Sequence, residues 1–534
     1  MPTPFAIPKQ NRIHFAFADG RLKATGPKDL DFSTPATVKE IFETHLPASG
    51  KKEISIYFHG GVVSSTTELG APGFPYRPDN QGLLDNLGQK SYPIFVVWET
   101  GLVETLKSIG QDIGDNPFQF LFELASKTAQ SELFKKAAAH ITSALSKKAA
   151  AMFGLGLAGE AEAPPPLPVA PLEQNIDRIP EFEPQVVEYE EMTEQDEQEF
   201  IALLEQDEEL NARLREIAEG GAAGLAAGDR SQADFVSDAL MEDINEDYDS
   251  AAAGLAGVGA VLFPLVYKKL GAVLLAIVKR FVSKRHHDFV PTLFEELTKV
   301  FALQKFAALL WKQMKDNAAE AYTANEPNDP EPHGGAFLIE QLKAYLLAHP
   351  ETEVNLVGHS AGSIQISHFV EAADNAFQQD LLGFKFKNII MLAPGADFPT
   401  FAKIHTRPQR FETLRIFTMT EELEKTDHMI PVVYPHSILY FVSGVADRDD
   451  SGDRPILGLA RHLDRKLFKG LGIHDAQVEA AHEFIDELTQ SSGSSPIVWT
   501  TTKDADPAGR RSNANRHGRF DNDPLTLESV RNYL

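Results

Sequence analysis

Hydrophobic residues in this chain follow two spacings that alternate along much of its length. Short, nearly continuous apolar runs at 53–61 (EISIYFHGG) and 92–100 (YPIFVVWET) are rich in β-branched and aromatic residues and are bounded by Gly, Asn or Pro. Such runs predict strands. Strands without polar alternation are typical of a parallel sheet whose two faces are both buried.

The C-terminal part of the chain repeats this alternation. The strand-like runs are EVNLVG (353–358), KNIIMLAPG (387–395), TLRIFTMT (413–420) and PIVWTTT (496–502). The runs with helical spacing are 337–350, 363–377, 435–446, 475–489 and 524–534. Strands that alternate with helices predict an α/β fold with a doubly wound, mostly parallel sheet.

A different kind of sequence separates the two ends. Residues 1–104 and 334–534 are predicted to form the two parts of one α/β core, and residues 105–333 to form a large, mainly helical insertion or cap. Within the insertion, the proline-rich run APPPLPVAP (163–171) predicts an extended spacer, and about 160–200 is interpreted as a partly disordered linker.

An acidic tract overlaps the proline-rich run. Residues 162–209 contain 16 acidic residues against the single base Arg178. A segment with this charge is predicted to be solvated and partly disordered. Its second half, within 193–219, keeps helical spacing, so an ordered helix there is the alternative.

The charge and composition of the chain exclude several functions. Acidic residues outnumber basic ones 77 to 50, and the net charge of −27 would repel the phosphates of nucleic acids. The absence of cysteine excludes disulfides, thiolate metal sites and cysteine nucleophiles. The first residues, MPTPFAIPKQ, lack the basic start and apolar run of a secretion signal, so we expect a cytoplasmic protein.

Residues 251–287 are the most apolar part of the chain. From Ala251 to Tyr267 there are 17 uncharged residues, at the lower edge of a membrane span, before Lys268 and Lys269 interrupt the run. We expect a buried apolar helical element that covers the active site and governs substrate access. A partner site, a membrane anchor or contact with a membrane surface are the alternatives.

The stretch VNLVGHSAGS places Ser360 where a predicted strand ends and a predicted helix begins. This is the context of a nucleophile elbow, a turn so tight that the residues two before and two after the serine must be small. Gly358 and Gly362 meet that need, with His359 and Ala361 completing the turn. The helix N-terminus also favours a developing oxyanion.

A second glycine turn, His59-Gly60-Gly61, follows an early predicted strand. Gly60 and Gly61 are therefore candidates to present a backbone N–H to the same oxyanion as the N–H of Ala361. A simple strand-ending turn is the alternative interpretation.

A serine nucleophile needs a histidine to accept its proton, and that histidine needs an acid to orient its ring. Of the 17 histidines, His517 lies in the loop between the last predicted strand and the closing helix. His359, His368, His474 and His482 lie in or beside predicted helices and are interpreted as ordinary histidines.

The loop after the run TLRIFTMT holds most of the candidates for the acid that orients the histidine. Asp427 is preferred because TDHMIP lets the chain turn away while the carboxylate stays at the end of the strand. The remaining candidates are Glu421, Glu422, Glu424 and, one strand earlier, Asp397.

Through YFHGG, GHSAGS, the acid after a later strand and RHGRFDND, the chain resembles the α/β-hydrolase superfamily and is similar to serine hydrolases of the lipase and esterase type. The resemblance covers about residues 50–104 and 334–534. It implies a catalytic triad and two oxyanion donors, carried here by Ser360, Asp427 and His517 and by Gly61 and Ala361. One departure is that caps in the family more often follow the strand after the nucleophile helix, whereas the insertion here precedes the nucleophile strand.

The expected activity is hydrolysis of a carboxylic ester through an acyl-serine intermediate, with no metal or organic cofactor. The apolar insertion favours a small-molecule or lipid ester with a long acyl chain. A peptidase or amidase with the same triad, a binding protein on a hydrolase fold, and a membrane-associated interaction protein built around 251–287 are the alternatives.

Overall fold

A computed structural model describes ten stretches of the chain: residues 14–17, 19–22, 33–60, 81–98, 212, 269–281, 283–300, 304–429, 434–448 and 452–534. The acidic tract with its proline-rich run, and residues 251–268 of the apolar segment, lie outside these stretches. The predictions made for them stay predictions.

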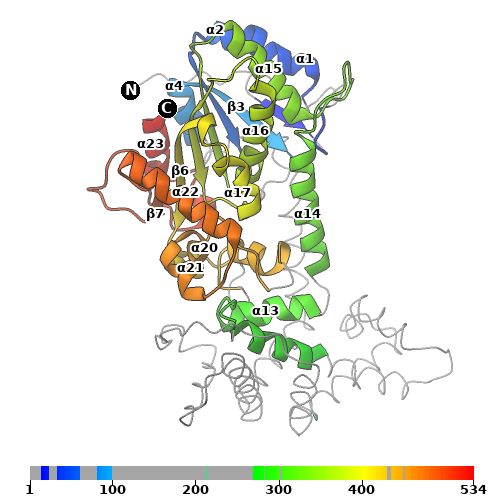
Figure 1. The fold of residues 1–534 in the computed structure, drawn as a ribbon, viewed down its shortest axis with the longest axis vertical. Helices are drawn as coiled ribbons and strands as arrows, with labels where there is room; N and C mark the ends of the chain where they lie inside the picture. Colours follow the sequence, from blue (N-terminus) through cyan, green and yellow to red (C-terminus); the bar gives the residue numbers. More distant parts are fainter. Residues whose placement is uncertain are drawn as a thin grey trace, which may run out of the picture.

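One sheet organises the described residues (Figure 1). Its strands are β1 (His14–Phe17), β2 (Glu53–Phe58), β3 (Tyr92–Trp98), β4 (Glu353–His359), β5 (Phe386–Leu392), β6 (Phe411–Met419) and β7 (Ile497–Thr500). They lie in the order β1-β3-β2-β4-β5-β6-β7, and every pairing is parallel. The carboxyl ends of all strands therefore meet at one edge, where α/β proteins bind ligands.

Helices connect the strands. The first ones along the chain are α1 (Pro35–Glu40), the π-helical η2 (Ile41–His45), α2 (Leu46–Ser49), α4 (Gln81–Lys90), α13 (Phe289–Val300), α14 (Gln304–Glu320), α15 (Gly334–Ala348), α16 (Gly362–Phe377) and α17 (Phe398–His405). The later ones are η3 (Pro408–Arg410), α18 (Glu421–Thr426), α19 (Ile438–Phe441), the π-helical η4 (Val442–Ala446), α20 (Ala460–Leu463), α21 (Arg465–Leu471), α22 (Ala476–Ser492), η5 (His517–Arg519) and α23 (Pro524–Tyr533).

Helices cover both faces of the sheet. Successive side chains of a strand point to opposite faces, so Ser55 and Phe58 of β2 lie on different sides. The Phe58 ring packs against Phe369 of α16, with 5.7 Å between centroids. On the other side, the Ser91 hydroxyl, just after α4, donates to Ser55 at 2.6 Å. Burial on both faces explains why β3 is buried at every position, as its uninterrupted apolar run predicts.

The α/β class predicted from the sequence is confirmed, and each predicted strand and helix outside the insertion has a counterpart in the structure. The run 435–446 differs in detail, because it divides into α19 and the π-helical η4. β1 was not predicted, since its four residues, HFAF, are too few for a period to be recognised.

Three helices of the insertion are described after residue 212: one over 269–281, α13 and α14. In the first of them, the apolar side chains Leu270, Val273, Leu274, Ile277 and Val278 are buried at helical spacing, and Leu275 and Arg280 are buried as well. Within the part of the chain that the structure describes, no helix has both the length and the apolar character needed to cross a bilayer.

Glu295 of α13 joins this end of the insertion to the rest of the protein. Its buried carboxylate accepts hydrogen bonds from Arg280 at 2.5 Å, from Nδ1 of His287 at 2.8 Å and from the Tyr434 hydroxyl at 2.6 Å. Gly444 of η4 lies so close that a Cβ there would come within 2.3 Å of the Glu295 side chain. Burial alone would raise the pKa of Glu295, but His287 and Arg280 beside it lower that pKa to about 2.

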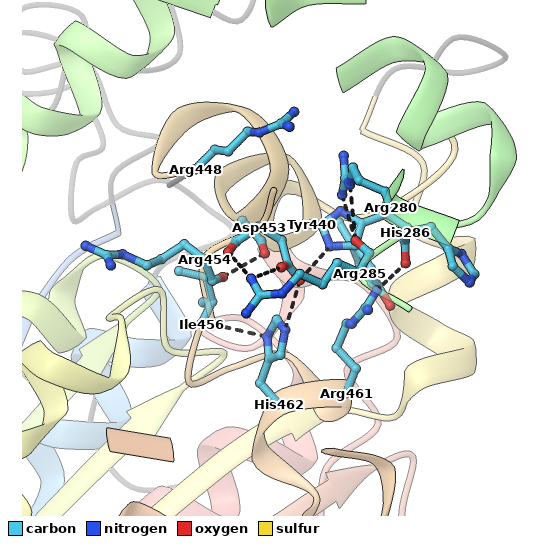
Figure 2. Close-up of polar contacts among 12 residues, drawn as sticks. Arg280, Arg285, His286, Tyr440, Arg448, Asp453, Arg454, Ile456, Arg461 and His462 are labelled. Atoms are coloured by element: carbon cyan, nitrogen blue, oxygen red, sulfur yellow. Dashed lines mark hydrogen bonds and ion pairs between the residues drawn. The ribbon is translucent and has the colours of Figure 1, made fainter. Parts of the chain in front are cut away.

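Asp453 forms a second junction in the same buried region, shown in Figure 2. Its Oδ1 pairs with Arg285 at 2.9 Å, and its Oδ2 faces the Nε2 atoms of His287 at 3.5 Å and of His462 at 3.6 Å. Since Arg285 and His287 precede α13 while Asp453 and His462 follow β6, these pairs hold the residues directly before α13 against the segment after β6.

Candidate functional site

The turn at Ser360 joins the end of β4 to the start of α16. Ser360 has φ of +52°, a left-handed conformation that a non-glycine residue adopts only when its surroundings require it. Its N–H donates to the Leu392 carbonyl at 2.9 Å, and its carbonyl accepts from the N–H groups of Gly395 at 2.9 Å and Ser363 at 3.0 Å. These bonds hold the turn rigidly and leave the serine hydroxyl at the carboxyl edge of the sheet.

Two glycines make the turn possible, as the sequence predicts. A Cβ at Gly362 would lie 2.2 Å from the carbonyl oxygen of Phe58, and a Cβ at Gly358 would lie 2.7 Å from the side chain of Ile366. The first contact is with backbone of the neighbouring strand β2, which the sheet holds in place. The close approach of α16 to β2 therefore requires glycine at 362.

Replacing Gly362 with alanine is expected to lower the free energy of unfolding by about 1–3 kcal/mol, because the added methyl overpacks against fixed backbone. Urea denaturation measures the change. Gly470→Ala in α21 is the matched control, since a Cβ there meets nothing within 4 Å and alanine favours a helix by roughly 0.5–1 kcal/mol. Equal effects of the two substitutions would contradict the proposed crowding.

His517, in η5 between β7 and α23, lies beside Ser360. Its Nε2 is 2.8 Å from the serine Oγ, and both residues are nearly buried, with 4 % and 5 % of their surfaces exposed. Burial, followed by the charge of nearby His359, holds the pKa of His517 well below its usual range. A neutral imidazole at this distance can accept the serine proton.

Asp427, just after α18, also meets His517, but through the backbone. Its Oδ2 accepts from the His517 N–H at 2.7 Å, while Nδ1 of the His517 ring is buried without a hydrogen-bond partner among the described residues. Burial, the largest effect, raises the pKa of Asp427. The structure thus brings the three predicted residues together, with the acid bound to the peptide of the histidine and not to its ring.

The other candidate acids are engaged elsewhere or exposed. Asp397 caps α17 through the Thr400 N–H at 2.9 Å. Glu421 accepts from the Tyr440 hydroxyl at 2.6 Å, and Glu422 is exposed.

Glu424 is a buried carboxyl one helical turn before Asp427. It accepts a hydrogen bond from the Ser437 hydroxyl. Burial raises the pKa of Glu424 well above its usual range, and the charge of Asp427 adds to that effect.

The predicted oxyanion turn is described up to Gly60, and Gly61 lies outside the described residues. His59 fixes this turn: its Nδ1 donates to the Gly60 carbonyl at 2.7 Å, and its Nε2 accepts from the Trp98 N–H at 3.1 Å. Burial lowers the pKa of His59 to about 4, so the ring is neutral at physiological pH. A Cβ at Gly60 would lie 3.1 Å from Cβ of Ser360, which puts the turn against the serine.

Ala361 occupies the N-cap position of α16, directly after the serine. Among the described residues its N–H has no acceptor. A free N–H at a helix N-terminus beside a serine hydroxyl is suited to bind an oxyanion.

One neighbour was missed by reasoning from the sequence. His359, interpreted there as an ordinary histidine of the turn, lies with its Nε2 2.9 Å from the carbonyl oxygen of His517. No periodic signal distinguishes it, because the contact joins the end of β4 to a loop more than 150 residues away.

Over the residues that the structure describes, no group of three or more histidine and acidic side chains is arranged to hold a metal ion. Comparisons of the chain with models of known protein families, with curated proteins and with solved structures found no match.

Proposed function

We propose that this protein is a serine hydrolase of the α/β-hydrolase type, which cleaves carboxylic esters through an acyl-serine intermediate. The observation that carries the proposal is the 2.8 Å contact between Ser360 Oγ and His517 Nε2 at a left-handed strand-to-helix turn. The order of the residues along the chain also supports it, because the serine follows β4, the acid follows β6 and the histidine follows β7.

In the proposed reaction His517 removes the proton from Ser360, whose oxygen attacks the ester carbonyl carbon. The carbonyl oxygen becomes an oxyanion, for which the N–H of Ala361 and an N–H of the Gly60-Gly61 turn are the proposed donors. The ester C–O bond then breaks, and the proton held by His517 leaves with the alcohol. Water repeats the sequence: His517 takes its proton, the hydroxide oxygen attacks the acyl carbon, and the acid is released with the proton returned to Ser360.

Asp427 is proposed to orient His517. A carboxylate has two oxygens, and only Oδ2 is used by the His517 N–H. Oδ1, for which no hydrogen bond is found among the described residues, would then accept the proton of Nδ1, the ring atom of His517 that also lacks a partner there. The imidazole would be held in the tautomer that leaves Nε2 free to receive the serine proton.

Covalent labelling tests the nucleophile. A fluorophosphonate probe is expected to label one residue, Ser360, as identified by mass spectrometry of the digested protein, and Ser360→Ala is expected to abolish labelling. Ser491→Ala, a change at an exposed serine in α22, is the matched control and should label like the unmodified protein. Labelling that survives Ser360→Ala would refute the assignment.

The proposed substrate class is an ester with a long acyl chain, on the basis of the apolar segment 251–287. p-Nitrophenyl esters of rising chain length test this directly, and matched p-nitroanilides distinguish an esterase from an amidase. Faster turnover of anilides than of esters would favour the peptidase alternative.

The acid limb of the pH profile is expected well below pH 6.5. A general base acts only when neutral, and the lowered pKa of His517 keeps it neutral as the pH falls. kcat/KM for a short ester should therefore be nearly equal at pH 6 and pH 8. Circular dichroism over the same range controls for unfolding, and an acid limb at or above pH 6.5 in folded protein would contradict a buried base.

A further inference from the structure

His359 makes a specific contact with the loop that carries His517. Its side chain is almost fully buried, and its Nε2 lies 2.9 Å from the His517 carbonyl oxygen. A carbonyl oxygen can only accept, so Nε2 of His359 carries a proton and donates it. The contact thus fixes the protonation of one nitrogen of His359 as well as the position of one peptide group.

The backbone of His517 is held through both its N–H and its carbonyl. Asp427 accepts from its N–H at 2.7 Å, and His359 donates to its carbonyl at 2.9 Å. These anchors come from two different places, Asp427 from the end of α18 and His359 from the last position of β4, while the loop itself connects β7 to α23. Since Ser360 directly follows His359, the nucleophile and one anchor of its base are neighbours on a single rigid turn.

The far side of His359 is also occupied. Its Nδ1 faces the Asp521 carboxylate at 3.6 Å, and Asp521 lies four residues after His517 in the same loop. The buried hydroxyl of Tyr57 in β2 donates to Asp521 in turn, and burial, followed by the Asp521 carboxylate, raises the pKa of that tyrosine. His359 is therefore fixed between the loop and the sheet.

We propose that His359 is a positioning residue, which holds the imidazole of His517 at the distance from Ser360 that proton transfer requires. This inference rests on the proposed function, because it assigns a role in the same reaction. A loop that closed a few tenths of an ångström away would still bind substrate, but proton transfer would slow, because catalysis is sensitive to small displacements of a catalytic group. Loss of the His359 contact should thus lower kcat and leave KM nearly unchanged.

Two substitutions separate donation from packing. His359→Phe keeps a ring and removes the donor, whereas His359→Gln supplies an amide N–H that reaches about as far as Nε2. We expect kcat for p-nitrophenyl ester hydrolysis to fall roughly 10- to 100-fold in His359→Phe with KM within about 2-fold. His359→Gln should recover most of that loss. His474→Phe, at a histidine whose side chain is 79 % exposed, is the matched control and should be unchanged.

The outcomes distinguish this inference from the proposed function. If the unmodified protein neither hydrolyses esters nor labels with a fluorophosphonate, the proposed function itself fails. If it does both and folded His359→Phe keeps kcat within about 3-fold, or if Gln is no better than Phe, the positioning role is overturned. Should His359→Phe fail to fold, His359→Asn replaces it, because the shorter amide of asparagine cannot reach the His517 carbonyl. The positioning role then predicts slow turnover for His359→Asn and fast turnover for His359→Gln.

Discussion

Under the proposed function, replacing His517 with alanine is expected to lower kcat for ester hydrolysis by about 10⁴- to 10⁶-fold, because members of a catalytic triad act as a unit. Without the imidazole 2.8 Å from its hydroxyl, Ser360 has no acceptor for its proton and remains a weak nucleophile. Ser360→Ala should cost about as much, and the double variant little more. KM should change far less than kcat, since neither side chain is needed to hold the substrate.

Steady-state hydrolysis of a p-nitrophenyl ester, with a sensitive assay for the residual rate, measures these losses. Asp427→Asn should also reduce kcat strongly, since an amide oxygen is a weaker acceptor for the His517 N–H and cannot stabilise an imidazolium. Glu422→Gln is the matched control, a carboxyl-to-amide change at an exposed position of α18. A silent Asp427→Asn together with a damaging Glu422→Gln would show that the acid is misassigned.

The second large effect is expected on stability, from Glu295→Ala. This change removes the carboxylate that accepts from Arg280, His287 and Tyr434. Among the described residues, the buried Arg280 guanidinium then keeps one ion-pair partner, Glu296 at 3.2 Å. Breaking a buried ion pair at one partner typically costs about 3–5 kcal/mol. The free energy of unfolding should fall by that amount.

Urea denaturation followed by circular dichroism measures the change. Asp316→Ala is the matched control: it breaks the ion pair with Lys312 on α14, where both side chains are exposed, and should cost less than about 1 kcal/mol. Glu295→Gln should fall between the two, because it keeps the volume and one acceptor oxygen. A loss for Glu295→Ala no larger than that for Asp316→Ala would mean that the junction adds little to stability.

The strands and helices of the core could be predicted because their burial leaves a periodic trace. Every residue of β3 is buried, so its apolar run is unbroken. After β4, the pattern changes to helical spacing just after Ser360, where α16 begins. Gly358 and Gly362 could be predicted as well, since a tight turn excludes side chains at fixed offsets from Ser360. These features depend on local geometry, which sequence spacing records.

Contacts between distant loops could not be predicted in the same way. The sequence placed His517 in the correct loop, but whether Asp427 binds its ring or its N–H depends on how some 20 residues between β7 and α23 are folded. The contact of His359 with the His517 carbonyl could not be predicted either, because it also depends on the fold of this loop. The buried contacts of Arg285 with Asp453 and of Tyr434 with Glu295 join residues 168 and 139 positions apart, and such pairing has no period along a chain.

The pairing of β2 with β4 has a consequence for how the protein is made. Phe58 lies opposite Gly358 in the middle of the sheet, yet about 250 residues separate the end of β3 from the start of β4. A ribosome that adds roughly 5–20 residues per second needs some tens of seconds to supply that interval. During this time β2 has an unpaired edge, and an unpaired apolar strand is a site of aggregation. The nascent chain should therefore depend on chaperones until β4 emerges, and the slow step of folding should be closure of this long-range pair.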